Sequence, residues 1–384
     1  MIKMRITIVQ GAFFPVPPVR GGAVEKVWDA LGREFARRGH AVTHLSRWCD
    51  GLPEREEIAG VRHVRVRGYD ACASGALLKW RDLLYSRRAR AALPPADILV
   101  TNTFWLPLLA PAPSCGKLCV HVARFPKGQL RFYGNAVRWQ CVSQAVADAA
   151  RRQAPALAER IRVLPNPLPE GAFEPAPSPD AARAPLVLYA GRIHPEKGLD
   201  LLAAAWTHPR ARAALAGWKL MLVGPVDEAH GGGGERYRAA LVERFRPAGD
   251  SVEWAGPWFG PDTEKLLALY RRARVFVYPS VAELGESFGL APLEAMAAGA
   301  PAVVSGLACF RDFLRDGENG VVFDHRAADA PERLADALAA LAGDPARRAR
   351  LAAAAWETAG HFRVEEVAGM YLNDFASLLA IPTA

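Results

Sequence analysis

The chain has 384 residues, of which 51% are hydrophobic and 23% charged, with a formal net charge of +8 at pH 7. This length favours two domains, and the composition is that of a soluble globular protein. No apolar run is long enough to form a membrane-spanning helix. The positive charge would suit anionic lipid, phosphorylated glycans or nucleic acid, but the sequence contains no nucleic-acid-binding module, and its arginines lack interleaved aromatic residues.

The first residues, M-I-K-M-R-I-T-I-V-Q-G, predict a core strand and not a signal peptide, so we expect a cytoplasmic protein. The six cysteines form no C-x-x-C pair and have no histidine cluster beside them. A zinc site and a disulfide framework are therefore not expected.

In the first half of the chain, a buried strand is predicted over Arg5–Gln10 and a helix over Ala23–Arg38, where apolar residues recur at spacings of three and four. Further strands are predicted at residues 41–45, 61–66, 98–101, 118–121, 140–142 and 161–164. Helical patterns lie between several of them. Strands that alternate with helices predict a parallel, doubly wound α/β sheet.

The segment Pro165–Pro185 is rich in proline and alanine, which is typical of an interdomain linker. After it the alternation restarts. Strands are predicted at residues 186–190, 220–223, 252–255, 275–278, 302–305 and 321–323, and helices near residues 198–205, 235–244, 263–273, 293–298, 331–341 and 345–358. The sequence therefore predicts two Rossmann-like domains, residues 1–168 and residues 169–361, that face a cleft.

The most informative stretch surrounds two glutamates, Glu286 and Glu294, with seven residues between them. The turn between them lies at the positive end of a predicted helix. There the backbone N–H groups of Phe288, Gly289 and Leu290 point toward one place, which suits a phosphate. The carboxylates of Glu286 and Glu294, about two helical turns apart, suit sugar hydroxyls. The stretch therefore predicts a nucleotide-sugar site. The alternative is an exposed helix start with an acid in its first turn.

A second group of charges follows the strand predicted at residues 186–190. Arg192 and Lys197, in the string G-R-I-H-P-E-K-G, lie just beyond the carboxyl end of that strand, where open α/β sheets bind ligands. Both can bind phosphate oxygens and stabilise a departing diphosphate without a metal. No Asp-x-Asp motif marks a metal site, so we expect neither a metal nor a cofactor. The alternative is a helix cap with surface cations.

Three features of the first half of the chain each allow two interpretations from the sequence alone. Gly21-Gly22 precedes the first long helix and permits close approach of a ligand, or it is a flexible loop. His121 ends a strand and is either a cleft residue or a structural histidine. The basic run Arg81–Arg90 either contacts an anionic membrane or is a solvated helix face. The fingerprint G-x-G-x-x-G of an NAD-binding domain is absent.

The stretch Tyr278–Ser305 resembles the E-x7-E signature of family 4 glycosyltransferases, which are retaining enzymes of GT-B fold. The string G-R-x-x-x-x-K-G resembles the diphosphate clamp of that family. The match includes Pro279-Ser280, Phe288-Gly289-Leu290, Leu293–Ala297 and Gly299-Ala300-Pro301. The resemblance implies the GT-B fold, with two Rossmann-like domains facing an interdomain cleft and a C-terminal helix, within residues 362–384, that crosses back to the first domain.

The resemblance also implies a role for each candidate residue. Arg192 and Lys197 would hold the diphosphate, and Glu294 the ribose. Glu286 and the amides of the turn would hold the sugar. From the first domain, the site would be completed by His121, Gly21 and Gly22. The segment Gly256–Gly260 occupies the position at which related enzymes seat the base.

The function implied is retaining transfer of a sugar from a UDP- or GDP-sugar to a glycan or lipid-linked acceptor. Many family members act in bacterial surface polysaccharide or lipopolysaccharide synthesis. Front-face transfer is favoured over a double displacement, because no acid of the first domain is placed by a motif.

Three other functions remain. A nucleotide-sugar epimerase of the same fold would be separated by product analysis without acceptor. A non-catalytic sugar-nucleotide or glycan-binding protein would lack turnover, and the intact charged residues argue against it. An oxidoreductase would respond to titration with NADH.

Overall fold

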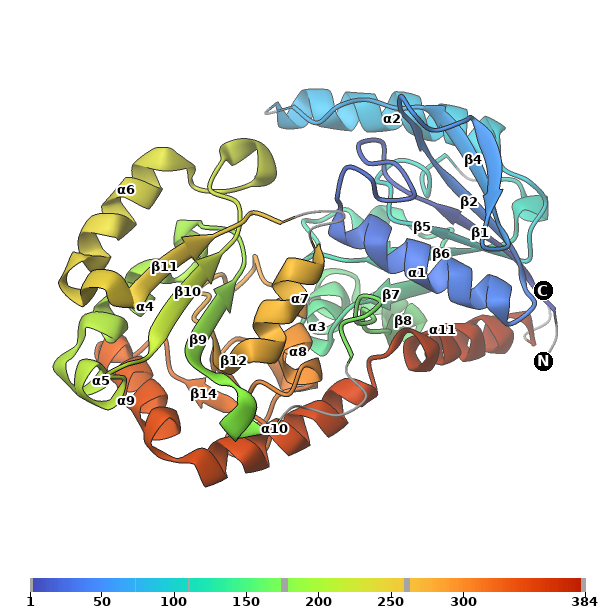
Figure 1. The fold of residues 1–384 in the computed structure, drawn as a ribbon. Coiled ribbons are helices and arrows are strands. Elements are labelled where there is room, and N and C mark those ends of the chain that lie inside the picture. The colour runs from blue at the N-terminus through green and yellow to red at the C-terminus, as the bar shows by residue number, and fades with distance from the viewer. Residues whose placement is uncertain (1–2, 73, 110, 174–178, 259–262, 381–384) are drawn as a thin grey trace. The chain divides into compact units, whose positions relative to one another are not determined.

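The computed structural model describes all residues except 1–2, 73, 110, 174–178, 259–262 and 381–384. The chain forms two compact units. Unit 1 contains residues 1–169 together with residues 362–384, and unit 2 contains residues 170–361 (Figure 1). Each unit is a sheet with helices packed against it.

Unit 1 is built on an eight-stranded sheet in the order β3-β4-β2-β1-β5-β6-β7-β8. Its strands are β1 (Arg5–Val9), β2 (Ala41–Trp48), β3 (Arg55–Ile58), β4 (Val61–Arg67), β5 (Ile98–Thr101), β6 (Lys117–Val122), β7 (Arg138–Cys141) and β8 (Ile161–Val163). Its helices are α1 (Ala23–Arg37), α2 (Gly75–Ala91), α3 (Gln144–Gln153) and α11 (Val364–Leu379).

The strand pairs of unit 1 are parallel, as predicted, except that β3 pairs antiparallel with β4. The sequence did not predict β3, because its residues R-E-E-I contain one apolar side chain and lie half exposed at the sheet edge. The remaining strands are short apolar runs, which is typical of parallel strands buried on both faces.

The main core of unit 1 lies between the sheet and the two helices α1 and α11, which lie next to each other (Figure 1). Trp28 of α1 packs edge-on against Tyr371 of α11 at 5.2 Å, and Phe35 packs against Phe375 at 6.0 Å between ring centroids. These aromatic pairs bury large apolar areas. The prediction that the last helix returns to the first domain is therefore confirmed.

Unit 2 is built on a six-stranded parallel sheet in the order β11-β10-β9-β12-β13-β14. Its strands are β9 (Ala184–Ala190), β10 (Lys219–Val223), β11 (Val252–Ala255), β12 (Ala273–Tyr278), β13 (Ala302–Ser305) and β14 (Val321–Phe323). Its helices are α4 (Leu199–Thr207), α5 (Pro209–Ala214), α6 (Gly234–Phe245), α7 (Thr263–Arg272), α8 (Leu290–Ala297), α9 (Ala330–Gly343) and α10 (Pro345–Gly360).

The strand order of unit 2 reverses at β9, whose neighbours are β10 on one side and β12 on the other. In open α/β sheets such a reversal opens a crevice at the carboxyl ends of the strands, where ligands bind. The buried Arg183, just before β9, donates to the carbonyl oxygens of Tyr270, Ala273 and Ala298. These bonds hold the end of α8 to the sheet, so the start of α8 is fixed beside the crevice.

None of the described helices combines the length and the apolar content that crossing a bilayer requires.

Two buried histidines face each other on neighbouring strands of unit 1. The register pairs His44 of β2 with His63 of β4, and their rings stack with centroids 5.7 Å apart. Burial, with Arg65 nearby, lowers the pKa of His63 to about 4 and the pKa of His44 well below its usual value. Both rings are therefore neutral in the folded protein near neutral pH.

This pair makes unit 1 sensitive to acid. A histidine with a lowered pKa in the folded state is protonated first in the unfolded state, so stability falls as the pH drops from about 6.5 toward the folded pKa. Between about pH 7 and pH 5, the wild type should lose about 3–4 kcal/mol more unfolding free energy than a His44→Leu/His63→Leu variant, because each histidine contributes about 2 kcal/mol. Thermal unfolding at the two pH values measures this. Equal losses in both proteins would show that other groups cause the acid sensitivity.

Candidate functional site

The site in unit 2 is formed by two loops that follow the parallel neighbours β9 and β12. The first loop runs over residues 191–198 and the second over residues 279–289. Gly198 has a φ of 68°, and a Cβ atom at this position would lie 2.0 Å from the carbonyl oxygen of Pro279. Only glycine lets the two loops approach this closely.

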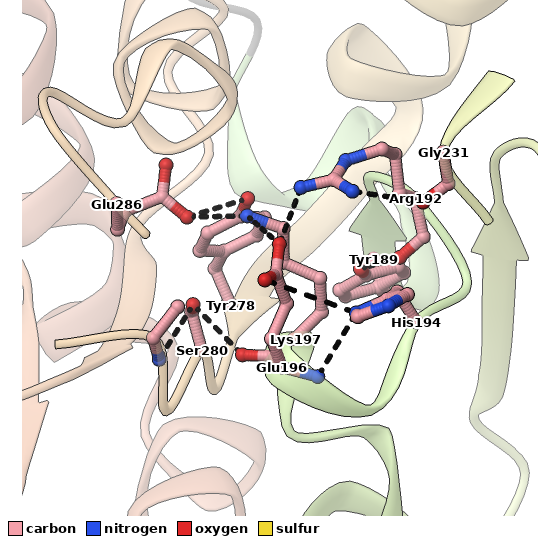
Figure 2. Close-up of polar contacts among 10 residues, drawn as sticks. Tyr189, Arg192, His194, Glu196, Lys197, Gly231, Tyr278, Ser280 and Glu286 are labelled. Atoms are coloured by element: carbon pink, nitrogen blue, oxygen red, sulfur yellow. Dashed lines mark hydrogen bonds and ion pairs between the residues drawn. The ribbon is translucent and has the colours of Figure 1, made fainter. Parts of the chain in front are cut away.

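Arg192 lies in the first loop and is held in place by two partners (Figure 2). Its guanidinium forms an ion pair with Glu196, and its Nη1 donates to the carbonyl oxygen of Gly231 at 2.8 Å. The sequence did not single out Glu196, although it lies in the same string as Arg192. A fixed guanidinium keeps its fork geometry, which is the form that binds phosphate oxygens.

Lys197 connects the two loops. Its Nζ donates to Oε2 of Glu286 at 2.7 Å, and the hydroxyl of Tyr278 donates to the same oxygen at 3.1 Å (Figure 2). Lys197 is 5% exposed, and its Nζ also lies 5.6 Å from the ring centroid of Tyr278. The predicted phosphate-binding cation and the predicted sugar-binding acid are therefore neighbours in one buried contact.

Two tyrosines form the floor beneath this contact. Tyr189 and Tyr278, from β9 and β12, stack with ring centroids 5.8 Å apart. Burial raises the pKa of both hydroxyls well above the usual value, with the charge of Glu286 as the next cause. Both therefore stay protonated as hydrogen-bond donors, and the hydroxyl of Tyr189 donates to the carbonyl oxygen of Arg192 at 2.8 Å.

The turn before α8 ends in a glycine with a left-handed backbone conformation. Gly289 is the N-cap with a φ of 91°, and a Cβ atom there would lie 2.4 Å from Cε1 of Phe310. Phe288 is buried, with its ring 5.6 Å from that of Phe313, so its side chain is a core element. No side chain caps the start of α8 at Leu290. The N–H groups of a first helical turn have no partner within the helix, so they are suited to an anion.

Glu294, in the middle of α8, accepts a hydrogen bond from the hydroxyl of Tyr270 at 2.9 Å and is half buried. Tyr270 lies on α7, and the sequence did not predict this contact. A carboxylate has about four lone-pair positions, so one that accepts this bond can accept further hydroxyls. The structure therefore places Arg192, Lys197, Glu286, Phe288, Gly289, Leu290 and Glu294 in the two loops and the helix that follow β9 and β12 in unit 2.

The remaining predicted residues, Gly21, Gly22 and His121, belong to unit 1. Gly21 and Gly22 have φ values of 80° and 100° and precede α1. His121 is the penultimate residue of β6, is 4% exposed and packs edge-on against Trp28 of α1 at 5.2 Å. Burial lowers its pKa to about 3, and neither ring nitrogen has a partner among the described residues.

His121 belongs to a row of polar residues that crosses the sheet of unit 1. The register places Gln10, Asn102, His121 and Gln140 side by side at the carboxyl ends of β1, β5, β6 and β7. Within the described chain, each has a buried polar side-chain atom without a hydrogen-bond partner. Buried polar groups are normally paired, so such a row is typical of a site for water or ligand hydroxyls. Of these four residues, the sequence analysis predicted only His121. The other three could have been found as polar residues at the end of an apolar strand.

Glu25 is a second residue that the sequence reasoning missed. It lies in the first turn of α1, and a Cβ atom on Gly22 would lie 2.3 Å from its Oε2. Burial raises its pKa to about 7, against a smaller opposing effect of Arg124. Unit 1 thus has a carboxyl group directly beside Gly22. In the sequence, this residue could have been found as an acid one helical turn after a Gly-Gly pair.

The predicted base site is described only in part, and the expected absence of a metal is not tested by the structure. Of the predicted base site, Gly256, Pro257 and Trp258 follow β11, whereas residues 259 and 260 lie outside the described residues. In the described part of the chain, no group of three or more His, Cys, Asp or Glu side chains could hold a metal ion.

The contact between Lys197 and Glu286 can be tested by mutation. Both side chains are at least 89% buried, since their exposures are 6% and 11%. Lys197→Met leaves the carboxylate of Glu286 buried without its cation and should cost about 3 kcal/mol of unfolding free energy. Adding Glu286→Gln, which keeps the shape and the bond to Tyr278, should restore more than half of that loss. Urea unfolding of the four proteins of this cycle measures the coupling, and additive losses would contradict a direct interaction.

Two family models match this chain. Residues 20–170 match the model described as Glycosyltransferase Family 4, and residues 184–344 match the model described as Glycosyl transferases group 1. The two matches together cover most of both units.

Two curated relatives share about a third of the aligned residues. A D-inositol 3-phosphate glycosyltransferase of Acidothermus cellulolyticus is 33% identical over 234 residues, which are 57% of this chain and 49% of that protein. A phosphatidyl-myo-inositol mannosyltransferase of Mycobacterium leprae is 34% identical over 243 residues, which are 61% of this chain and 58% of that protein. The chain thus spans about half the length of the curated relatives it matches.

Solved structures with the same fold are more distant in sequence. A sucrose-phosphate synthase of Thermosynechococcus elongatus superposes with a TM-score of 0.80 at 22% identity, over 98% of this chain and 100% of that one. An Anabaena HepE structure in complex with UDP-glucose superposes with a TM-score of 0.68 at 20% identity, over 97% and 100% of the two chains. These similarities support the predicted GT-B fold.

Proposed function

This chain belongs to glycosyltransferase family 4, and we propose that it transfers a hexose from a nucleotide-sugar donor to a glycan or lipid-linked acceptor, with retention at the anomeric carbon. The observation that carries the proposal is the crevice of unit 2. There Arg192, the contact between Lys197 and Glu286, and the uncapped start of α8 meet at the carboxyl ends of β9 and β12.

Each residue of the crevice has a distinct role in donor binding. The guanidinium of Arg192 and the ammonium of Lys197 bind the diphosphate together with the amides before α8. Lys197 has three N–H groups, so it can bind a phosphate oxygen while it keeps Glu286 in place. Glu286 then accepts hydrogen bonds from sugar hydroxyls, and Glu294 accepts them from the ribose.

The transfer step needs stabilisation of the diphosphate that leaves. Arg192 and Lys197 are fixed before the reaction, so they can stabilise the charge that develops on the leaving oxygen without reorganisation. In the proposed front-face mechanism, an oxygen of the leaving phosphate takes the proton of the acceptor hydroxyl, which attacks on the same face. A covalent glycosyl-enzyme adduct trapped on Glu25 or another carboxylate would contradict this mechanism.

In unit 1, Gly21, Gly22 and His121 are proposed to bind substrate, and Gln10 and Asn102 to bind hydroxyls. The names of the curated relatives, which concern inositol phosphate and phosphatidylinositol, support an acceptor with hydroxyls on a ring. The HepE complex with UDP-glucose supports a UDP-sugar donor, with a GDP-sugar as the alternative. A role in surface polysaccharide or lipopolysaccharide synthesis at the inner face of the cytoplasmic membrane is proposed on the family resemblance alone.

The donor site is tested by calorimetric titration with UDP, GDP and ADP. One nucleotide should bind with micromolar affinity, and Arg192→Ala and Glu294→Ala should each weaken it by about tenfold to a hundredfold, because each removes a charge-assisted hydrogen bond. Arg236→Ala, an exposed arginine of α6 without a partner among the described residues, is the matched control and should bind like the wild type. If the folded protein binds no nucleotide, the non-catalytic binding protein becomes the better reading.

The proposed metal independence has its own test. Transfer from the donor identified by titration should proceed at the same rate in excess EDTA as in added Mg²⁺ or Mn²⁺, because fixed cations replace the metal. Loss of transfer in EDTA, with recovery on adding a divalent ion, would overturn metal independence. Conversion of the donor without any acceptor would instead favour the epimerase.

A further inference from the structure

A pocket of unit 1 lies at the carboxyl ends of the parallel neighbours β2 and β4, where the register pairs Trp48 with Arg67. It has a volume of about 190 Å³. Its charged and aromatic lining residues are Arg20, Arg47, Trp48, Asp50, Arg67 and Asp70. Pockets for drug-sized ligands begin at roughly 300 Å³, so this one has room for a single sugar ring and not for a nucleotide.

Arg47 is the buried charge of this pocket, since its residue is only 7% exposed. Its Nη1 donates to the carbonyl oxygens of Phe13 and Tyr69 at 2.8 and 2.7 Å and to Oδ1 of Asp70 at 2.9 Å. Its Nε donates to the carbonyl oxygen of Trp48 at 3.4 Å, whereas Nη2 has no partner among the described residues. Buried donors are normally paired, so a guanidinium held by two of its nitrogens, with the third left unpaired beside a pocket, is typical of an anion site.

The backbone around Arg47 is closely packed, which fixes the guanidinium in place. A Cβ atom on Gly68 would lie 2.5 Å from Cβ of Arg47 and 2.6 Å from the carbonyl oxygen of Ala12. The N–H of Tyr69 donates to the same carbonyl oxygen at 3.0 Å. The loop after β1, the end of β2 and the turn after β4 therefore hold one another, so the pocket needs little reorganisation to bind a ligand.

Two further arginines and two acids complete the charges of the lining. The Nη1 of Arg20 lies 3.3 Å from Oδ1 of Asp70, whose pKa is lowered first by the hydrogen bond from Arg47. Arg67 is exposed, and its guanidinium has no partner among the described residues. Asp50 is exposed as well. Three guanidinium groups and two carboxylates leave the lining with one net positive charge, which a single carboxylate on a ligand would neutralise.

An indole ring adds an apolar surface to these charges. Trp48 is the last residue of β2 and is 40% exposed, and its Nε1 has no hydrogen-bond partner among the described residues. An indole offers a large apolar face and one N–H donor, so it can pack against the C–H face of a sugar ring. The carboxylate of Asp50 can accept hydrogen bonds from the hydroxyls of such a ring.

The pocket lies at the same edge of the sheet as the polar row from Gln10 to Gln140. In the sheet, β2 lies between β4 and β1, and the N–H of Gln10 donates to the carbonyl oxygen of Leu45 of β2 at 2.9 Å. Neighbouring strands are about 4.8 Å apart, so the pocket begins about one strand spacing from Gln10. Adjacent units of one glycan can therefore occupy the pocket and the row together.

We propose that this pocket binds a uronic acid unit of the acceptor glycan, next to the unit that receives the transferred sugar. The Nη2 of Arg47 and the guanidinium of Arg67 bind the carboxylate, and Trp48 packs against the ring. A phosphate dianion fits less well, because its second charge would leave the lining, with Asp50 and Asp70, net negative. The inference deepens the proposed function, on which it rests for the role of the pocket in acceptor binding.

The test is titration of the full chain with three pyranose probes, followed by NMR: methyl glucuronide, methyl glucoside and glucose 6-phosphate. The glucuronide should bind with a Kd of about 1 mM, and the glucoside about tenfold or more weakly, because it lacks the charged acceptor. Glucose 6-phosphate should also bind more weakly than the glucuronide. Arg67→Gln and Trp48→Ala should each weaken binding of the glucuronide about tenfold, since one removes a charge-assisted hydrogen bond and the other the ring surface.

Arg62→Gln is the matched control, because it changes an exposed arginine near the other end of β4, and it should bind like the wild type. Thermal unfolding should show that each variant is as stable as the wild type. Absence of glucuronide binding, equal affinity for the glucoside, or tighter binding of glucose 6-phosphate would each overturn the proposal, even if the protein binds a nucleotide. Glucuronide binding by a protein that binds no nucleotide would instead refute the donor site and leave the acidic-sugar pocket standing.

Discussion

The contact between Lys197 and Glu286 determines how the crevice of unit 2 is built. It joins two loops that are separated by 89 positions in the sequence, and it buries both charged side chains. A buried charge without its partner is costly, so neither loop can take its position independently. Tyr278 fixes the carboxylate, and Gly198 permits the close approach of the backbones. One interaction thus places the cation proposed to bind phosphate and the acid proposed to bind sugar at a fixed distance from each other.

Much of the fold could be predicted, because parallel strands buried on both faces are short apolar runs that interrupt helical periodicity. The strands β1, β5, β9 and β12 follow this rule. The antiparallel edge strand β3 does not, since R-E-E-I has no apolar alternation, and α5 is too short to show a helical period. In both cases tertiary contacts, which a local pattern does not contain, determine the structure.

The candidate site was predictable to the extent that its residues are close in the sequence. The turn at Gly289 and the string from Arg192 to Lys197 each lie within one loop. The spacing of their residues in the sequence is therefore enough to predict a phosphate-binding arrangement. The bond from Tyr270 to Glu294 and the row from Gln10 to Gln140 depend on pairing between distant elements. Strand register is set by the packing of whole strands, so a single sequence gives no direct signal for such contacts.

One buried acid, Asp82, helps to determine which side of helix α2 faces the interior of unit 1. The backbone N–H groups of Phe104 and Trp105 donate to Oδ2 of Asp82 at 3.1 and 3.3 Å. The loop after β5 therefore requires this carboxylate on the inner side of the helix. Burial raises the pKa of Asp82 to about 6, opposed by these two hydrogen bonds, which favour its charged form. Because Leu77 and Trp80 lie on the opposite side from Asp82, the contact that orders the loop also turns these two side chains outward. Asp82, together with the fully buried Tyr85 and Ala89 of the same face, therefore anchors the helix.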